Sequence, residues 1–314
     1  MRNDERLHKD QSDHTSRALS AVYPDYPFHS KYFNIAGERL HYIDEGCGPV
    51  IVMVHGNPTW SYYFRHLITL FKKSHRVIAL DHIGCGLSDK PADYPYCLAS
   101  HIANLESLLN HLQIDRFFLV VHDWGGAIGI GCAVKQLEKI ERIVVMNTAA
   151  FRSSRIPWRI RFCRFPLVGE IVVRLFNGFA GPARYMAVTK KMPAATARAY
   201  LAPYDSWRNR VAIYRFVQDI PMDARHRSYS TLVEIEKRLP LIRDRKIPLL
   251  IIWGGKDFCF NDSFFAEWQK RFPEARSHYF SDGGHYILED KAEEIGPILQ
   301  NFFSAGKFPE TAGG

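Results

Sequence analysis

An aspartate stands where an apolar strand pattern turns sharply into a helical one. The apolar run 117–121 is followed by HDWGG (122–126) and then by the helical stretch 127–134, so that Asp123 occupies the turn. In hydrolytic enzymes a strand–turn–helix of this kind presents the nucleophile above a sheet. A carboxylate there attacks carbon and forms an alkyl ester, whereas serine transfers an acyl group. The structural alternative is that Asp123 caps the helix, since Asp is among the best N-caps.

Two more polar side chains follow late strand patterns. Asp257 comes after the apolar run 249–253, and His285 comes after the run 277–280. With the aspartate of the turn they form a nucleophile, an acid and a histidine in an order that one large class of hydrolases uses. Each has a structural alternative, because Asp is common in turns and loops also contain histidines. Their occurrence in this order favours a catalytic triad, in which Asp262 is a rival for the acid.

Asn57 and Trp124 supply hydrogen-bond donors near the same turn. Asn57 follows the apolar run 50–54, and Trp124 directly follows Asp123. Their side-chain N–H groups can hold an anionic leaving group in a dry pocket, and their backbone N–H groups can form an oxyanion hole. The structural alternative for Asn57 is that it stabilises the turn before Pro58. The sequence thus predicts a site that stabilises negative charge.

These side chains need a scaffold in which several strands end at one edge. Short apolar runs alternate with helical patterns, which indicates an α/β fold with a mostly parallel central sheet flanked by helices. The expected strands are Arg39–Asp44, Val50–Val54, Arg76–Leu80, Phe117–Val121, Arg142–Met146, Pro248–Trp253 and Ser277–Phe280. The expected helices lie near Ser61–Phe71, at Leu98–Leu112, after Asp123 and at about Ala292–Phe303.

The pattern changes between residues 151 and 227. Prolines, arginines and aromatic residues dominate there, and strand patterns are absent. We interpret this segment as a helical cap (151–227) inserted between two strands of a core formed by residues 21–150 and 228–314. Such a cap would lie above the carboxyl ends of the strands, exclude water and shape a pocket. Residues 1–20 are polar and are expected to form a flexible tail.

The composition is that of an ordinary globular protein with a sizeable core. The chain has 314 residues, of which 46% are hydrophobic and 24% are charged, and its formal net charge is +8. Its basic residues are scattered, which argues against a nucleic-acid partner. The densest cluster lies in 152–164, where arginines alternate with Ile, Trp and Phe. A solvated helix face is one interpretation of this cluster, and contact with an acidic partner or a membrane surface is the other.

The six cysteines are widely spaced, without a CxxC pair or zinc-type spacing with histidine. This usage indicates reduced thiols. Neither a signal peptide nor an apolar stretch of ~20 residues is visible. We therefore expect a cytoplasmic location, no membrane span, no metal and no organic cofactor.

Five segments carry a resemblance to a known family. They are VHGNPTWSYYFRHL (54–67), LDHIGCGLSDKP (80–91), VVHDWGGAIG (120–129), IIWGGKDF (251–258) and DGGHYILED (282–290). Over roughly residues 20–305 the chain resembles the haloalkane dehalogenase family, which has the α/β-hydrolase fold. PWRIRF (157–162), MNTAAF (146–151), YLAPYDSW (200–207) and FVQDIP (216–221) are similar to its third subfamily. They are equally similar to a close relative of that subfamily, the β-lactone decarboxylase of bacterial long-chain olefin biosynthesis.

The resemblance implies a role for each site residue. Asp123 displaces the leaving group and becomes an alkyl ester, which water activated by His285 hydrolyses. Asp257 orients the imidazole, and the residue at the end of an earlier strand, where other subfamilies carry this acid, is an asparagine. Asn57 and Trp124 hold the departing halide ion. The implied substrate is a small apolar molecule, either a halogenated alkane or an alkyl β-lactone.

Several functions are compatible with these residues. A haloalkane dehalogenase, which gives alcohol and halide, is the first expectation, and a cis-3-alkyl-4-alkyloxetan-2-one decarboxylase, which gives a long-chain alkene and CO2, shares its catalytic residues. A non-catalytic binding protein is the alternative from another class, and the intact triad weighs against it. The sequence also allows an oligomer. An epoxide hydrolase would need cap tyrosines to protonate its substrate, and the candidates are Tyr185, Tyr200, Tyr204 and Tyr214.

Overall fold

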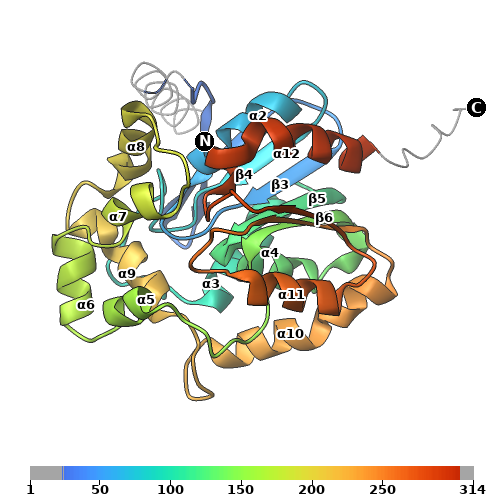
Figure 1. Ribbon diagram of the computed structural model, residues 1–314. Helices are drawn as coiled ribbons and strands as arrows, with labels where there is room; N and C mark the ends of the chain where they lie inside the picture. The colour runs from blue at the N-terminus through green and yellow to red at the C-terminus, as the bar shows by residue number, and fades with distance from the viewer. Residues whose placement is uncertain (1–22, 24, 305–314) are drawn as a thin grey trace, which may run out of the picture.

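A single eight-stranded sheet forms the centre of the described part of the molecule (Figure 1). The structure is a computed structural model that describes residue 23 and residues 25–304, so the predicted tail lies outside the described residues. The strands are β1 (Ser30–Ile35), β2 (Glu38–Glu45), β3 (Val50–Val54), β4 (Arg76–Leu80), β5 (Phe117–Asp123), β6 (Ile140–Thr148), β7 (Leu249–Gly254) and β8 (Arg276–Phe280).

The sheet is mostly parallel, as the sequence predicts. Its strand order is β1-β2-β4-β3-β5-β6-β7-β8. Only β2 runs against its neighbours, since it pairs antiparallel with both β1 and β4. The pairs from β4 to β8 are all parallel. The α/β class is therefore confirmed, and the parallel strands bring their carboxyl ends to one edge.

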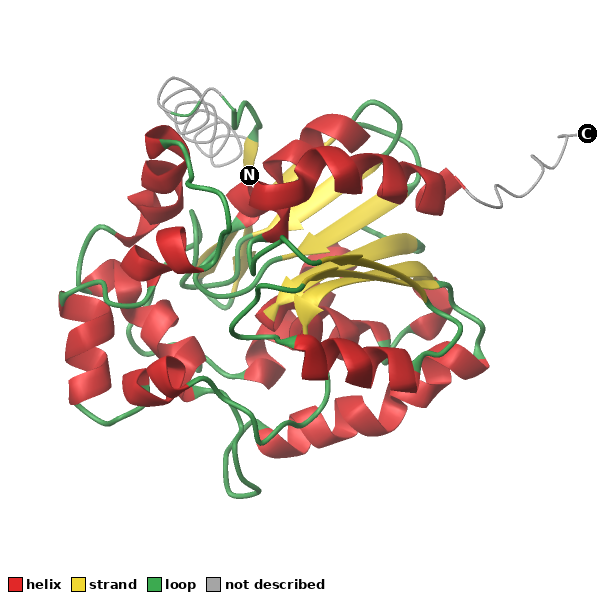
Figure 2. Cartoon of the chain, viewed as in Figure 1, coloured by secondary structure: helices red, strands yellow, loops and turns green. Residues whose placement is uncertain are grey.

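Helices cover both faces of this sheet (Figure 2). Alternate residues of a strand point to opposite faces, and on β3 Val52 packs into one core while Ile51 and Met53 pack into the other. One face is covered by η1 (Ser61–Phe64), α2 (Arg65–Phe71) and α12 (Ile287–Ser304). The other is covered by α3 (Leu98–His111), α4 (Trp124–Ala133), α10 (Tyr229–Asp244) and α11 (Asp262–Arg271), with the short η2 (Leu137–Lys139) before β6.

Between β6 and α10 the chain forms a layer of short helices beside the sheet (Figure 1). These helices fall in the segment that the sequence interprets as a cap, and that domain division stays a prediction. No helix among the described residues is both long and apolar enough to cross a lipid bilayer. The helices are α5 (Trp158–Cys163), α6 (Val168–Glu170), the π-helix η3 (Ile171–Leu175), α7 (Ala180–Met186), α8 (Ala194–Leu201), η4 (Ala202–Tyr204), η5 (Arg208–Arg210) and α9 (Val211–Gln218).

All seven expected strands are present, but β1, α10 and α11 are not predicted by the sequence. β1 is an edge strand that pairs only with β2, and most of its residues are half-buried, so it lacks a continuous apolar run. α11 begins at Asp262, so this rival for the acid lies at the start of a helix. Asn261 caps this helix by accepting a hydrogen bond from the Ser263 N–H.

The turn between β5 and α4 is closely packed against the rest of the sheet. A Cβ at Gly125 would overlap the backbone carbonyl oxygen of Val54, which ends β3. A Cβ at Gly126 would overlap the hydroxyl of Thr148, which ends β6. The two glycines thus let the first turn of α4 lie directly against the ends of the neighbouring strands.

We therefore expect Gly125→Ala to destabilise the protein by about 1–3 kcal/mol, because the obstructing atoms belong to backbone that cannot move aside cheaply. Urea unfolding would measure this loss. Gly181→Ala in α7 is the matched control, since a Cβ there meets nothing closer than 3.9 Å. Ala is also the better helix former, so the control should be neutral or slightly stabilising. Equal stability in the two variants would mean that close packing at Gly125 is not required.

Candidate active site

Asp123 occupies a strained turn at the end of β5. Its backbone adopts φ 53° and ψ −129°, and it is the last residue before α4. A positive φ is uncommon for a residue with a side chain and is held by its surroundings. Here the hydroxyl of Thr148 donates a hydrogen bond to the Asp123 carbonyl oxygen. The Asp123 side chain makes no capping hydrogen bond beyond the first residue of α4, so the helix-cap interpretation does not describe it.

The Asp123 carboxylate is met by backbone donors from two elements. The Asn57 N–H, in the loop after β3, donates to Oδ1 over 2.6 Å. The Trp124 N–H, at the start of α4, also donates to this carboxylate. The sequence predicts these two N–H groups as an oxyanion hole, and the structure brings both to the carboxylate itself.

The side chains of Asn57 and Trp124 line the same cavity as Asp123. The Asn57 amide donates one hydrogen bond, over 3.2 Å, to the carbonyl oxygen of Ile213 in α9. An amide nitrogen carries two N–H groups, so one remains for a ligand. The Asn57 Oδ1 atom is buried and has no hydrogen-bond partner among the described residues. The loop is thus tied to the layer of short helices through Asn57.

His285 lies between two carboxylates, those of Asp257 and Asp123. Its Nδ1 is 2.7 Å from Asp257 Oδ2, which is a short hydrogen bond. Its Nε2 is 3.5 Å from Asp123 Oδ2. All three side chains are buried. The structure therefore brings together the three residues that the sequence proposes as nucleophile, acid and histidine.

Asp257 receives hydrogen bonds on both oxygens. Its Oδ1 accepts from the backbone N–H groups of Cys259 over 2.6 Å and Phe260 over 3.1 Å. Its Oδ2 accepts from the Asn147 amide over 3.0 Å as well as from His285. A buried carboxylate with this many donors is fixed in position.

Asn147 has a positioning function that the sequence does not reveal. It is the last residue but one of β6, adjacent to β7. Its side chain holds Gly254 through a 2.8 Å bond from the Gly254 N–H and a 3.1 Å bond to the Gly254 carbonyl. The asparagine at the alternative acid position thus supports Asp257. The only sequence signal was a polar residue at the end of an apolar strand.

His122, the residue before Asp123, supports the histidine of the triad. Its Nε2 donates to the backbone carbonyl of His285 over 2.8 Å. Its ring stacks on Tyr63, with the ring centroids 4.3 Å apart. Burial holds the pKa of His122 well below its ordinary value, so this ring is neutral. This contact was not visible in the sequence, because the two residues are 163 positions apart.

Asp262 is held away from the histidine. It begins α11, and its Oδ1 accepts a 2.9 Å hydrogen bond from the hydroxyl of Tyr279 on β8. Of the two candidate acids, only Asp257 contacts His285. The geometry therefore favours Asp257 over its rival.

Burial and neighbouring charges act in opposite directions on the pKa values of this site. Burial raises the pKa of Asp123 above its ordinary value, although His285 and the two backbone N–H groups work against the shift. Burial alone would lower the pKa of His285, but the Asp257 and Asp123 carboxylates outweigh it and raise that pKa. Perturbed values of this kind in a cavity are typical of functional sites.

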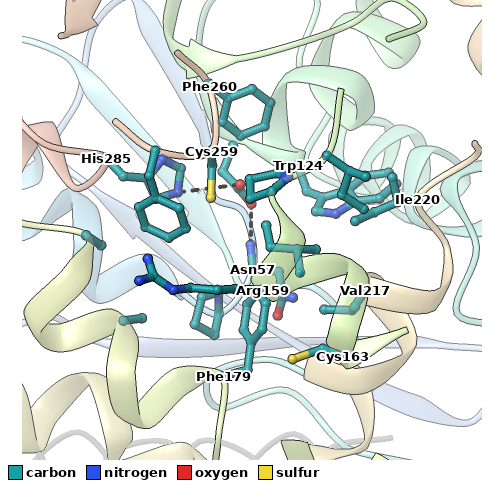
Figure 3. A pocket seen from close by; sticks show the side chains of 18 of the residues that line it. Asn57, Trp124, Arg159, Cys163, Phe179, Val217, Ile220, Cys259, Phe260 and His285 are labelled. Atoms are coloured by element: carbon teal, nitrogen blue, oxygen red, sulfur yellow. Dashed lines mark hydrogen bonds and ion pairs between the residues drawn. The ribbon is translucent and has the colours of Figure 1, made fainter. Parts of the chain in front are cut away.

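The site forms the floor of an apolar cavity of about 480 Å³. Its walls come from both the sheet edge and the short helices, and the latter contribute Trp158, Phe162, Phe179 and Val217. Figure 3 shows Phe179 and Val217 on the side of the cavity opposite His285. Among the described residues, no group of three or more His, Cys, Asp and Glu side chains is arranged to hold a metal ion. The cavity therefore suits an apolar ligand with its reactive group at Asp123.

The four tyrosines considered for epoxide chemistry do not line this cavity. The Tyr200 hydroxyl donates to Glu289 over 2.5 Å, and the Tyr204 hydroxyl donates to the Thr59 carbonyl over 3.2 Å. Tyr214 is buried elsewhere in the core, and Tyr185 is 62% exposed. The geometry thus provides no cap tyrosine to protonate an epoxide.

Comparison with known proteins places this site in a family. A family model described as the alpha/beta hydrolase fold matches residues 49–292. The chain is 44% identical to the cis-3-alkyl-4-alkyloxetan-2-one decarboxylase of Shewanella oneidensis, over 88% of this chain and 89% of the relative. It is 29% identical to haloalkane dehalogenase 2 of Mycobacterium bovis, over 88% of this chain and 96% of the relative.

A solved structure agrees with these matches. The haloalkane dehalogenase DatA of Agrobacterium tumefaciens aligns with a TM-score of 0.79 at 24% identity, covering 88% of this chain and 96% of that chain. Likeness at this level of identity concerns the fold alone. Together with the family model, it confirms the fold that the sequence predicts. The chain belongs to the α/β-hydrolase family.

Proposed function

We propose that this chain is an enzyme in which Asp123 attacks a carbon atom of an apolar substrate. The observation that carries the proposal is the contact chain from Asp257 through His285 to Asp123 at the floor of an apolar cavity. A charged oxygen nucleophile in a dry site is strongly reactive because little water solvates it. Asn57 and Trp124 are the proposed donors for the leaving group and the oxyanion.

We favour decarboxylation of a cis-3-alkyl-4-alkyloxetan-2-one, a β-lactone with two alkyl chains. The support is the 44% identity with a decarboxylase of this name, against 29% with the dehalogenase. Asp123 would form a bond to the alkyl-bearing ring carbon that is bonded to the ring oxygen. The bond between that carbon and the ring oxygen would break and leave a free carboxylate on the neighbouring carbon. Loss of CO2 would then supply the electron pair for the C=C bond as Asp123 departs. The steps balance without water or a cofactor.

Dehalogenation of an alkane is the second candidate. The observation that favours it is the pair of side chains, Trp124 and Asn57, beside Asp123 at the cavity. An indole N–H and the remaining amide N–H are suitable donors for a halide ion that forms in an apolar site. In this reaction His285 would deprotonate a water molecule, which attacks the alkyl ester and regenerates Asp123. Epoxide hydrolysis has less support, since cap tyrosines are not available at the cavity.

Asp123→Ala should abolish both candidate reactions, because it removes the nucleophile. The purified protein and the variant would be offered a cis-β-lactone and a brominated alkane, with alkene, CO2 and bromide as the measured products. Circular dichroism would verify that the variant is folded. A folded variant that keeps more than a trace of either activity would contradict the proposed nucleophile.

His285→Gln should separate the two reactions, since only dehalogenation consumes water. With a brominated alkane, the variant should release at most one bromide per protein and retain the alkyl group on Asp123, as measured by mass spectrometry. With the β-lactone, alkene should still form over many turnovers. The double variant Asp123→Ala with His285→Gln is the control and should carry no adduct. Continued bromide turnover by His285→Gln would exclude this histidine as the base.

Asp257→Asn should slow the water-dependent reaction severely, on the order of 10⁴-fold if it acts as the acid of a serine-protease triad does. The reason is that an amide cannot stabilise the imidazolium form of His285. Asp262→Asn is the matched control and should have a mild effect, since Asp262 contacts Tyr279 on the protein surface. Rates of bromide release under identical conditions would be compared. A severe loss in Asp262→Asn with near-normal Asp257→Asn would reverse the assignment.

A further inference from the structure

Large apolar side chains are concentrated on one exposed segment. Of the twelve most exposed in the described part of the chain, eight lie between residues 158 and 176. Trp158 and Phe176 are each 72% exposed, and Leu167 is 75% exposed. Concentrated apolar exposure of this kind marks an interaction surface. We call this set the cap patch; it consists of Trp158, Phe162, Phe165, Leu167, Val168, Ile171, Leu175 and Phe176.

The cap patch is continuous over two packed helical elements. Leu167 directly precedes α6, Ile171 and Leu175 lie on η3, and all three side chains are exposed. On α5, the ring of Phe162 contacts that of Phe165 edge-on, with centroids 6.2 Å apart. α6 lies at the outer edge of the helical layer, away from the sheet (Figure 1).

The segment around the cap patch is strongly basic. Residues 152–191 contain nine Arg or Lys and one acidic residue, Glu170, so the segment has a formal charge of +8, which equals that of the whole chain. Glu170 is already paired with Arg174. Arg159 and Arg161 are exposed, and neither has an acidic partner among the described residues. The chain's excess positive charge is thus concentrated where its apolar side chains are exposed.

The cap patch also borders the entrance of the active-site cavity. Trp158 and Phe162 belong to the cap patch and also line the cavity. The exposed arginines Arg155 and Arg159 beside them line the cavity too. Residues that are both exposed and in contact with the cavity form its rim. An apolar ligand that reaches Asp123 by this entrance would therefore pass the cap patch.

We propose that the cap patch docks on the surface of a lipid bilayer that contains anionic lipids. Its apolar side chains enter the boundary between headgroups and acyl chains, and the arginines contact the phosphate groups. A second copy of the chain is a poor occupant, because two faces of the same charge repel each other. The charge of an acidic protein would match the arginines, but acidity alone provides no apolar surface for the exposed rings. An anionic bilayer provides both. Docking places the cavity entrance at the bilayer, and it does not depend on the chemistry proposed above.

Tryptophan fluorescence of the wild-type protein is the first test. Trp60, Trp253 and Trp268 are fully buried, whereas Trp158 in the patch and Trp207 beside it are exposed. Trp207 is a neighbour of the patch because the Arg174 guanidinium lies 4.3 Å from its ring. Vesicles of phosphatidylcholine with phosphatidylglycerol should shift the emission to the blue, and brominated acyl chains should quench it. Phosphatidylcholine vesicles alone should bind about tenfold more weakly, since each basic residue near an anionic surface contributes to binding.

Two matched pairs of variants identify the surface. Leu167→Ser with Leu175→Ser should weaken co-sedimentation with the anionic vesicles by about tenfold or more, because two apolar side chains no longer enter the bilayer. Leu241→Ser on α10 is the control, since Leu241 is 42% exposed but lies outside the patch. Arg161→Gln should also weaken binding, whereas Arg225→Gln, which changes an exposed arginine elsewhere, should not.

Several outcomes would overturn the proposal. One is the absence of both quenching and co-sedimentation with anionic vesicles. Another is an equal loss of binding in the patch variants and in the Leu241→Ser control. A third is sedimentation velocity showing, without lipid, that Leu167→Ser with Leu175→Ser converts a dimer into a monomer, which would assign the cap patch to contact between copies. None of these measurements uses the catalytic reaction, so their failure is distinct from failure of the proposed function.

Discussion

The arrangement of this protein depends on keeping a buried carboxylate charged. A carboxylate in an apolar cavity takes up a proton unless donors or positive charge stabilise it. Burial raises the pKa of Asp123, and the N–H groups of Asn57 and Trp124 together with the nearby His285 oppose that rise. These groups converge because the turn has a positive φ and because Gly125 lets α4 approach the end of β3. The environment of the proposed nucleophile thus depends on the packing of β5, α4 and the loop after β3 against one another.

The histidine depends on the neighbouring strands in the same way. His285 is held from one side by Asp257 and from the other by His122, which binds its backbone carbonyl. Asp257 is itself held by Asn147, whose amide also joins β6 to β7. Since every partner is buried and hydrogen-bonded, the imidazole has little freedom to turn. A fixed imidazole is what proton transfer at a single oxygen or water molecule requires.

The layer of short helices gives the site an apolar enclosure and connects it with the outside. Its side chains form much of the cavity wall, and Asn57 is bonded to its helix α9 through Ile213. An apolar wall strengthens the electrostatic interactions at the floor, because little water is present to screen them. The same layer exposes the basic, apolar cap patch at the cavity rim. The proposed docking on a bilayer and the proposed entry of substrate therefore both involve the layer of short helices between β6 and α10.

The parallel strands, the turn at Asp123 and the candidates Asp257 and His285 can all be predicted from the amino-acid sequence, because buried strands are apolar runs and polar residues at their ends are conspicuous. It does not reveal β1, which is an edge strand of half-buried residues, nor the helices α10 and α11. Nor did it reveal the support from His122 and Asn147, or the absence of cap tyrosines from the cavity. These contacts become visible in the folded molecule, because hydrogen bonds between residues more than 100 positions apart depend on strand order and packing, which local patterns do not encode.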